Sequence, residues 1–147
     1  MKKNIYKIDH FYISGHDDNC VILESEIDVS RMVRILAAME FKYEALVDEE
    51  SSLIPLEALI LLEKFFNVED VKDKYRSLLS FTHIDDQEWE MVNIFKFRKL
   101  EIVQIDLYET REYYCGARYD EAMLELAELT DFDSEIIKFK DNIKINE

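Results

Sequence analysis

The sequence predicts an α+β domain in which an antiparallel sheet of four or five strands is covered, mainly on one face, by about four helices. Two kinds of segment support this class. Residues 5–13 are rich in Ile, Tyr and Phe, and residues 103–107 and 137–145 alternate apolar with polar side chains, as strands do. Other segments space their apolar residues at the helical period. Because 147 residues, 48% of them hydrophobic, suffice for one core, we expect a single domain over residues 1–147.

The chain is expected to begin with a β-hairpin. The strand-like residues 5–13 are followed at residues 14–19 by Ser-Gly-His-Asp-Asp-Asn, a strong turn signal. Residues 20–24 then have the composition of a returning strand.

Three helices are predicted after the hairpin. Apolar residues at helical spacing indicate the first over residues 28–47, with Asp28 or Ser30 as its N-terminal cap. Pro55 suits the first position of a second helix, which is predicted over residues 55–66. Asn67 breaks the second helix and favours a third over residues 68–81. Because the connection between them is so short, the second and third helices are expected to pack as an antiparallel pair.

The second half of the chain is predicted to mix strands and one helix. Residues 88–98 fit either a helix or a strand, and the alternation slightly favours the strand, whereas residues 103–107 form a clearer strand. After a tyrosine-rich turn around Gly116, residues 118–130 have helical spacing. Residues 137–145 are expected to form a C-terminal strand with lysines on its outer face.

Acidity is the most informative feature of the composition. The net charge is −15, and the stretch 101–135 contributes −9 of it, from eleven acidic and two basic residues. Within the predicted helix, Glu121, Glu125 and Glu128 are spaced four and three apart. Like charges at such spacing destabilise a helix by about 0.2–0.5 kcal/mol per pair. This pattern is typical either of a solvated surface or of a face that binds a basic partner.

Four tyrosines lie among these acids, and tyrosine is enriched in binding hot spots. Tyr108 and Tyr119 are expected at the edge of the core, and Tyr113 and Tyr114, next to the turn, are expected to be exposed. The predicted partner-binding residues are Glu109, Glu112, Tyr113, Tyr114, Asp120, Glu121, Glu125 and Glu128.

Signals of catalysis or of cofactor binding are weak. Cys20 and Cys115 form no metal or redox motif, and the two glycines stand apart, so no phosphate-binding loop is expected and no cofactor is predicted. His10, His16 and Asp17 offer a conceivable metal site without a recognised ligand spacing. A Cys115 nucleophile paired with His83 is likewise conceivable, although nothing in the sequence places the two together.

The composition therefore favours a cytoplasmic, non-enzymatic inhibitor that occludes a basic protein. An immunity protein against a basic toxin, plausibly a nuclease, is the leading hypothesis. The alternatives are an anti-defence protein that mimics nucleic acid, a small metal-dependent hydrolase, and an oligomerisation scaffold. Direct nucleic-acid binding is disfavoured because basic residues form no patch outside residues 138–144, and no apolar run approaches the roughly 20 residues of a membrane span.

Overall fold

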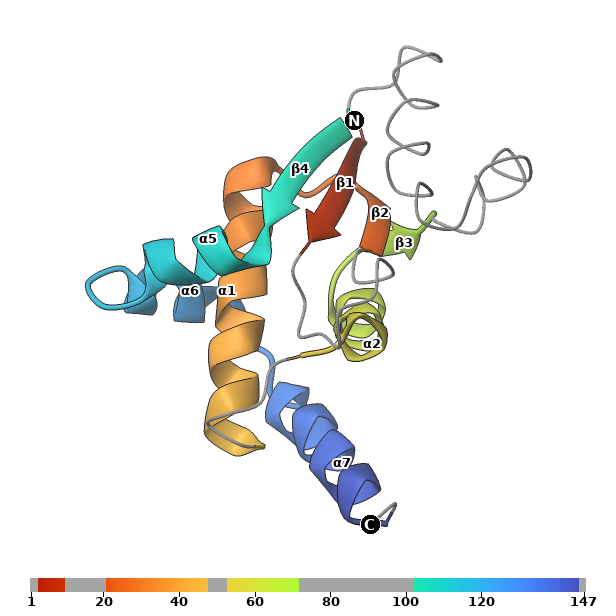
Figure 1. The fold of residues 1–147 in the computed structure, drawn as a ribbon, viewed down its shortest axis with the longest axis vertical. Coiled ribbons are helices and arrows are strands. Elements are labelled where there is room, and N and C mark those ends of the chain that lie inside the picture. Colours follow the sequence, from red (N-terminus) through yellow and green to blue (C-terminus); the bar gives the residue numbers. More distant parts are fainter. Residues whose placement is uncertain (1–2, 10–20, 48–52, 72–101, 146–147) are drawn as a thin grey trace.

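A computed structural model describes residues 3–9, 21–47, 53–71 and 102–145 (Figure 1). These residues form a mixed four-stranded sheet and five α-helices, which confirms the α+β class. The strands are β1 (Asn4–Asp9), β2 (Val21–Ser25), β3 (Val68–Asp70) and β4 (Ile102–Asp106). The α-helices are α1 (Val29–Leu46), α2 (Pro55–Phe65), α5 (Leu107–Tyr114), α6 (Tyr119–Met123) and α7 (Phe132–Ile145), and a 3₁₀ helix, η3, spans Leu124–Leu126.

The sheet has the strand order β3-β2-β1-β4. Strands β1 and β2 pair antiparallel, which confirms the N-terminal hairpin, and β3 pairs antiparallel with β2. The expectation of a wholly antiparallel sheet is wrong, because β4 runs parallel to β1. Parallel neighbours need a long crossover, and here α1, α2 and β3 all lie between the two strands in the sequence.

Helix α1 is the centre of the helical layer. It begins as predicted after Asp28, whose side chain accepts a hydrogen bond from the Arg31 amide at 2.8 Å, so Asp28 rather than Ser30 is the cap. The α5, α6 and α7 helices and η3 all contact α1 (Figure 1). Its fully buried side chains include Met32, Ile35, Leu36, Ala37, Ala38 and Met39.

The second predicted helix is confirmed as α2, but the third is wrong where the structure describes it. The chain is extended at Phe66, and residues 68–70 form β3 on the edge of β2. The Ser25 hydroxyl donates to the Asn67 carbonyl at 2.8 Å, and the Val71 amide donates to the Ile22 carbonyl at 3.0 Å. The open edge of β2 thus satisfies backbone groups that the predicted helix would have paired internally.

The C-terminal part differs most from the prediction. The tyrosines expected in a turn lie mainly on α5, and the helix predicted over residues 118–130 is only α6 and the short η3. The expected C-terminal strand is wrong, because these residues belong to α7. Phe132, Ile136 and Phe139, at i, i+4 and i+7, are all buried and lie on one helical face. None of the helices in the described ranges combines the length and apolar composition that crossing a membrane requires.

The contact between the buried Tyr43 and the partly buried Glu57 is expected to depend on pH. The Tyr43 hydroxyl hydrogen-bonds the Glu57 carboxylate, and burial raises the pKa of Glu57 above its ordinary value, although this hydrogen bond and one from the Ile54 amide oppose the rise. Glu57 therefore binds a proton more tightly in the native state than in the unfolded state. The free energy of unfolding falls as the pH rises above the pKa that Glu57 has in the unfolded chain.

We expect Glu57→Gln to stabilise the fold relative to the parent at pH 7 and to lose this advantage about two pH units below the ordinary glutamate pKa, where Glu57 is protonated in both states. Urea unfolding at both pH values measures the difference. The exposed Glu63 on the same helix provides the control, because Glu63→Gln removes the same charge without removing a buried group. A gain for Glu57→Gln that does not change with pH would contradict the assignment.

Candidate functional site

Helices α5 and α6 form a helical hairpin that extends from the sheet across α1 (Figure 1). Helix α5 starts directly after β4, where the Asp106 side chain accepts a hydrogen bond from the Glu109 amide at 3.1 Å. Gly116 makes the turn between the helices with φ at +92°, a conformation that glycine adopts without strain. Most of the predicted partner-binding residues are positioned by this hairpin.

The tyrosines are arranged by the helical period of α5. Because Leu107, Thr110 and Tyr114 are buried against α1, Tyr108 and Tyr113 turn outward and are 65% and 55% exposed. The expected exposure of Tyr113 is confirmed, and that of Tyr114, only 6% exposed, is wrong. The expectation that Tyr108 lies at the core edge is also wrong. The sequence predicts a turn here, and a turn has no helical period that would assign side chains to an inner and an outer face.

Five of the predicted carboxylates are exposed: Glu109, Glu112, Asp120, Glu121 and Glu128. Glu109 and Glu112 are three apart on α5 and therefore share a face. Asp120 and Glu121 follow in the first turn of α6. Within the described part of the chain, none of the five forms a salt bridge. We call the exposed tyrosines and carboxylates of the hairpin the α5–α6 surface: Tyr108, Glu109, Glu112, Tyr113, Tyr119, Asp120 and Glu121. Arg118, in the turn between the helices, is exposed as well.

Glu125 is placed differently from the other acids. Its Oε2 lies 2.9 Å from the Arg31 Nε and its Oε1 lies 3.2 Å from the Arg34 Nε, and its side chain is only 16% exposed. Glu125 thus joins η3 to α1. The predicted row of Glu121, Glu125 and Glu128 is interrupted, because α6 ends at Met123 and Glu125 turns inward.

The two arginines of the acidic stretch leave the carboxylates of the α5–α6 surface without a salt bridge. Arg111 forms a salt bridge with Glu44 of α1. The Arg118 guanidinium lies over the Tyr113 ring, 4.3 Å from its centroid. The negative charge of the α5–α6 surface is therefore left for solvent or for a partner.

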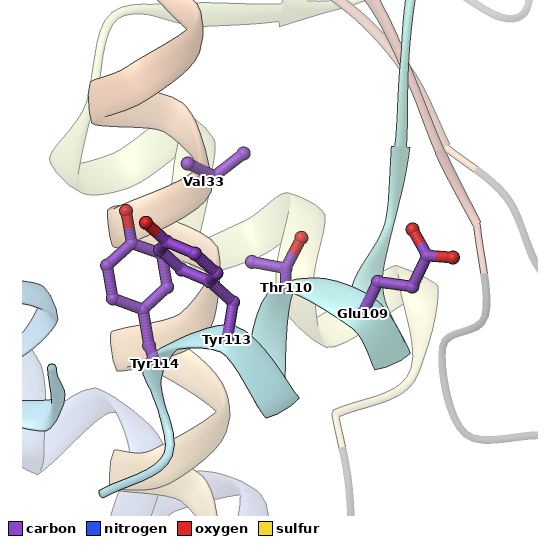
Figure 2. A pocket seen from close by; sticks show the side chains of 5 residues that line it. All are labelled: Val33, Glu109, Thr110, Tyr113 and Tyr114. Atoms are coloured by element: carbon purple, nitrogen blue, oxygen red, sulfur yellow. The ribbon is translucent and has the colours of Figure 1, made fainter. Parts of the chain in front are cut away.

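A shallow hollow of about 260 Å³ lies between α1 and α5 (Figure 2). Its lining consists of Val33, Glu109, Thr110, Tyr113 and Tyr114. The two tyrosine rings meet edge to face, with centroids 5.0 Å apart and an interplanar angle of 78°. Three of these five were predicted as binding residues. Val33 and Thr110 were missed, because only the packing of α5 on α1 brings them together.

The residues considered for catalysis are mostly outside the described ranges: His10, His16, Asp17, Cys20 and His83. Cys115 is described, and its side chain is exposed and reduced. Among the residues that the structure does describe, no three His, Cys, Asp or Glu side chains are grouped to hold a metal ion.

Comparison of the chain with protein-family models, with curated proteins and with solved structures finds no match. Function has to be argued from the α5–α6 surface and the hollow beside it.

Proposed function

We propose that this chain is an acidic, protein-binding inhibitor, of the type of an immunity protein that neutralises a basic toxin. The main support is the α5–α6 surface, where exposed carboxylates without salt bridges in the described structure surround exposed tyrosines. A merely solvated surface needs the charge but not the three large rings, which are 65%, 55% and 40% exposed at Tyr108, Tyr113 and Tyr119. Exposed aromatic groups among charges are typical of binding hot spots.

The proposed mechanism is steric occlusion. Carboxylates of the hairpin pair with arginines and lysines around the partner's substrate cleft, and the tyrosine rings pack against its apolar rim. A nuclease is the favoured target class, because its cleft is lined with cations that bind phosphate. The charge of −15 speeds the encounter with such a partner and makes the association rate fall with salt.

The test is a double charge reversal on the hairpin, Glu112→Lys with Glu121→Lys. Both side chains are exposed and form no salt bridge among the described residues, so the fold should persist. The parent chain, immobilised at low salt, should capture a basic protein, which is then purified and assayed for nuclease activity with and without the chain. We expect the parent to inhibit the activity and the double variant to bind about tenfold more weakly or worse, which corresponds to about 1.4 kcal/mol or more.

A second pair of acids away from the hairpin gives the matched control. Glu63→Lys with Glu69→Lys changes the net charge equally, and both residues are exposed, on α2 and β3. The control should lose affinity far less than the hairpin variant. Equal losses in the two variants would mean that net charge alone attracts the partner. An undiminished affinity in the hairpin variant would rule out the α5–α6 surface as the inhibitory site.

A further inference from the structure

We infer that the hollow between α1 and α5 is a receptor for an arginine side chain of the partner. This inference rests on the proposed function and adds the chemistry of the group that is recognised. It depends on how the five lining side chains are arranged, on the groups that already contact the two tyrosines, and on the charge around the opening.

The lining of the hollow suits a long side chain with a charged, planar end. Val33 and the tyrosine rings provide apolar surface for the methylene groups of an arginine. Thr110 provides a hydroxyl, and the Glu109 carboxylate stands at the end of the row of lining residues on α5 (Figure 2). A volume of about 260 Å³ is large enough to admit one such side chain, yet small for a whole drug-sized ligand.

Both tyrosines of the hollow already interact with guanidinium groups of the chain itself. Arg118 lies over the Tyr113 ring at 4.3 Å from its centroid, whereas Arg34 forms a side-chain hydrogen bond with Tyr114. Neither arginine lines the hollow. A guanidinium stacks on an aromatic ring more readily than an ammonium, because it is planar and more weakly hydrated. The stacked contact on Tyr113 therefore favours arginine over lysine as the entering group.

Two carboxylates beside the opening favour a cation, and they stand against the two arginines, Arg118 and Arg34, that already contact its tyrosines. Glu109 lines the hollow, and Glu112 follows it one helical turn later on the same face of α5. Both carboxylates are exposed, and neither has a salt bridge within the described residues. A carboxylate accepts two parallel hydrogen bonds from one guanidinium, which Lys cannot provide in the same geometry. Figure 2 shows the Glu109 carboxylate beyond Thr110, at the opposite end of the lining from the tyrosine rings, so an arginine has to extend past Thr110 to meet it.

A small guanidinium probe tests this assignment without the partner. N-acetyl-arginine amide is titrated into the isotope-labelled chain and followed by NMR, with N-acetyl-lysine amide as the comparison probe. We expect the arginine probe to shift the signals of Val33, Thr110 and Tyr113 in a saturable way, and to bind at least threefold more tightly than the lysine probe. Equal binding of both probes, or no saturable shift at these residues, would overturn the assignment.

Two variants locate the probe. Tyr113→Ala removes an exposed ring and should weaken binding about fivefold, and Glu109→Gln should weaken it about twofold to fivefold. Glu63→Gln, on the exposed face of α2, makes the same change of charge as Glu109→Gln and should leave the affinity unaltered. If Tyr113→Ala and Glu109→Gln bind the probe as the parent does, the hollow is not the binding site.

The same variants separate failure of this inference from failure of the proposed function. If the charge reversal at Glu112 and Glu121 abolishes inhibition while Tyr113→Ala neither weakens it nor changes probe binding, the inhibitor stands and the arginine receptor is wrong. If the probe binds in the hollow but the charge reversal leaves the captured protein bound and inhibited, the occlusion mechanism fails and the receptor stands.

Discussion

Phe132→Ala is expected to destabilise the fold by about 3–5 kcal/mol, as alanine does at fully buried phenylalanines. Phe132 is the first residue of α7 and has no solvent exposure, and its ring centroid lies 5.1 Å from that of Phe65 on α2. Removing the ring leaves a cavity where α7 meets α2. Equilibrium unfolding in urea at pH 7, followed by circular dichroism, measures the change.

Ile137→Ala is the control on the same helix. Ile137 is 41% exposed, and alanine favours a helix more than isoleucine does, so its effect should stay within about 0.5 kcal/mol. The C-terminal strand predicted from the sequence implies the opposite order, because Ile137 would then lie on its buried face and Phe132 would precede it. A large loss for Ile137→Ala with a small one for Phe132→Ala would show that α7 is wrong.

The first half of the fold, apart from β3, could be predicted because its signals are local. The hairpin of β1 and β2 follows from two strand-like segments, and α1 begins after the capping Asp28 that its sequence suggests. Pro55 at the start of α2 is also a local signal, because proline favours the first position of a helix. In each case the residues that decide the structure are close neighbours in the chain.

The C-terminal helix shows where a local pattern is ambiguous. Ile137 and Phe139 alternate with lysines at a period of two, but Phe132, Ile136 and Phe139 repeat at the helical period. Contacts with α1 and α2 decide between them. Salt bridges join Lys42 to Asp133 at 2.9 Å and Lys64 to Glu135, and these partners are 91 and 71 residues apart in the sequence.

The candidate site could be located from the sequence but not assembled from it. The high density of acids and tyrosines indicated the region that became the α5–α6 surface. Which tyrosine faces outward depended on whether residues 107–114 form a turn or a helix. Whether an acid is available to a partner depended on arginines far away in the sequence, and Glu125 is the clearest example.

Glu125→Lys is expected to destabilise the fold by about 2–3 kcal/mol. The loss should lie between that of an exposed pair, about 0–1 kcal/mol, and that of a buried pair, about 3–5 kcal/mol. Glu125 is 16% exposed, whereas Arg31 and Arg34 are 47% and 30% exposed. The variant also brings three cations together where η3 meets α1. Urea unfolding at low and high salt measures the loss, part of which should disappear as salt screens the repulsion.

Glu128→Lys is the matched control, because Glu128 is exposed and forms no salt bridge within the described structure. Its effect on stability should stay within about 0.5 kcal/mol. Equal stabilities of the two variants would mean that Glu125 is free to contact a partner, as the sequence predicted.

If Glu125→Lys is the less stable variant, any loss of partner binding that it shows would reflect loosening of the hairpin from α1. Tests of the proposed inhibitor must then rely on Glu112 and Glu121, whose charges can be reversed without breaking a salt bridge that the structure describes.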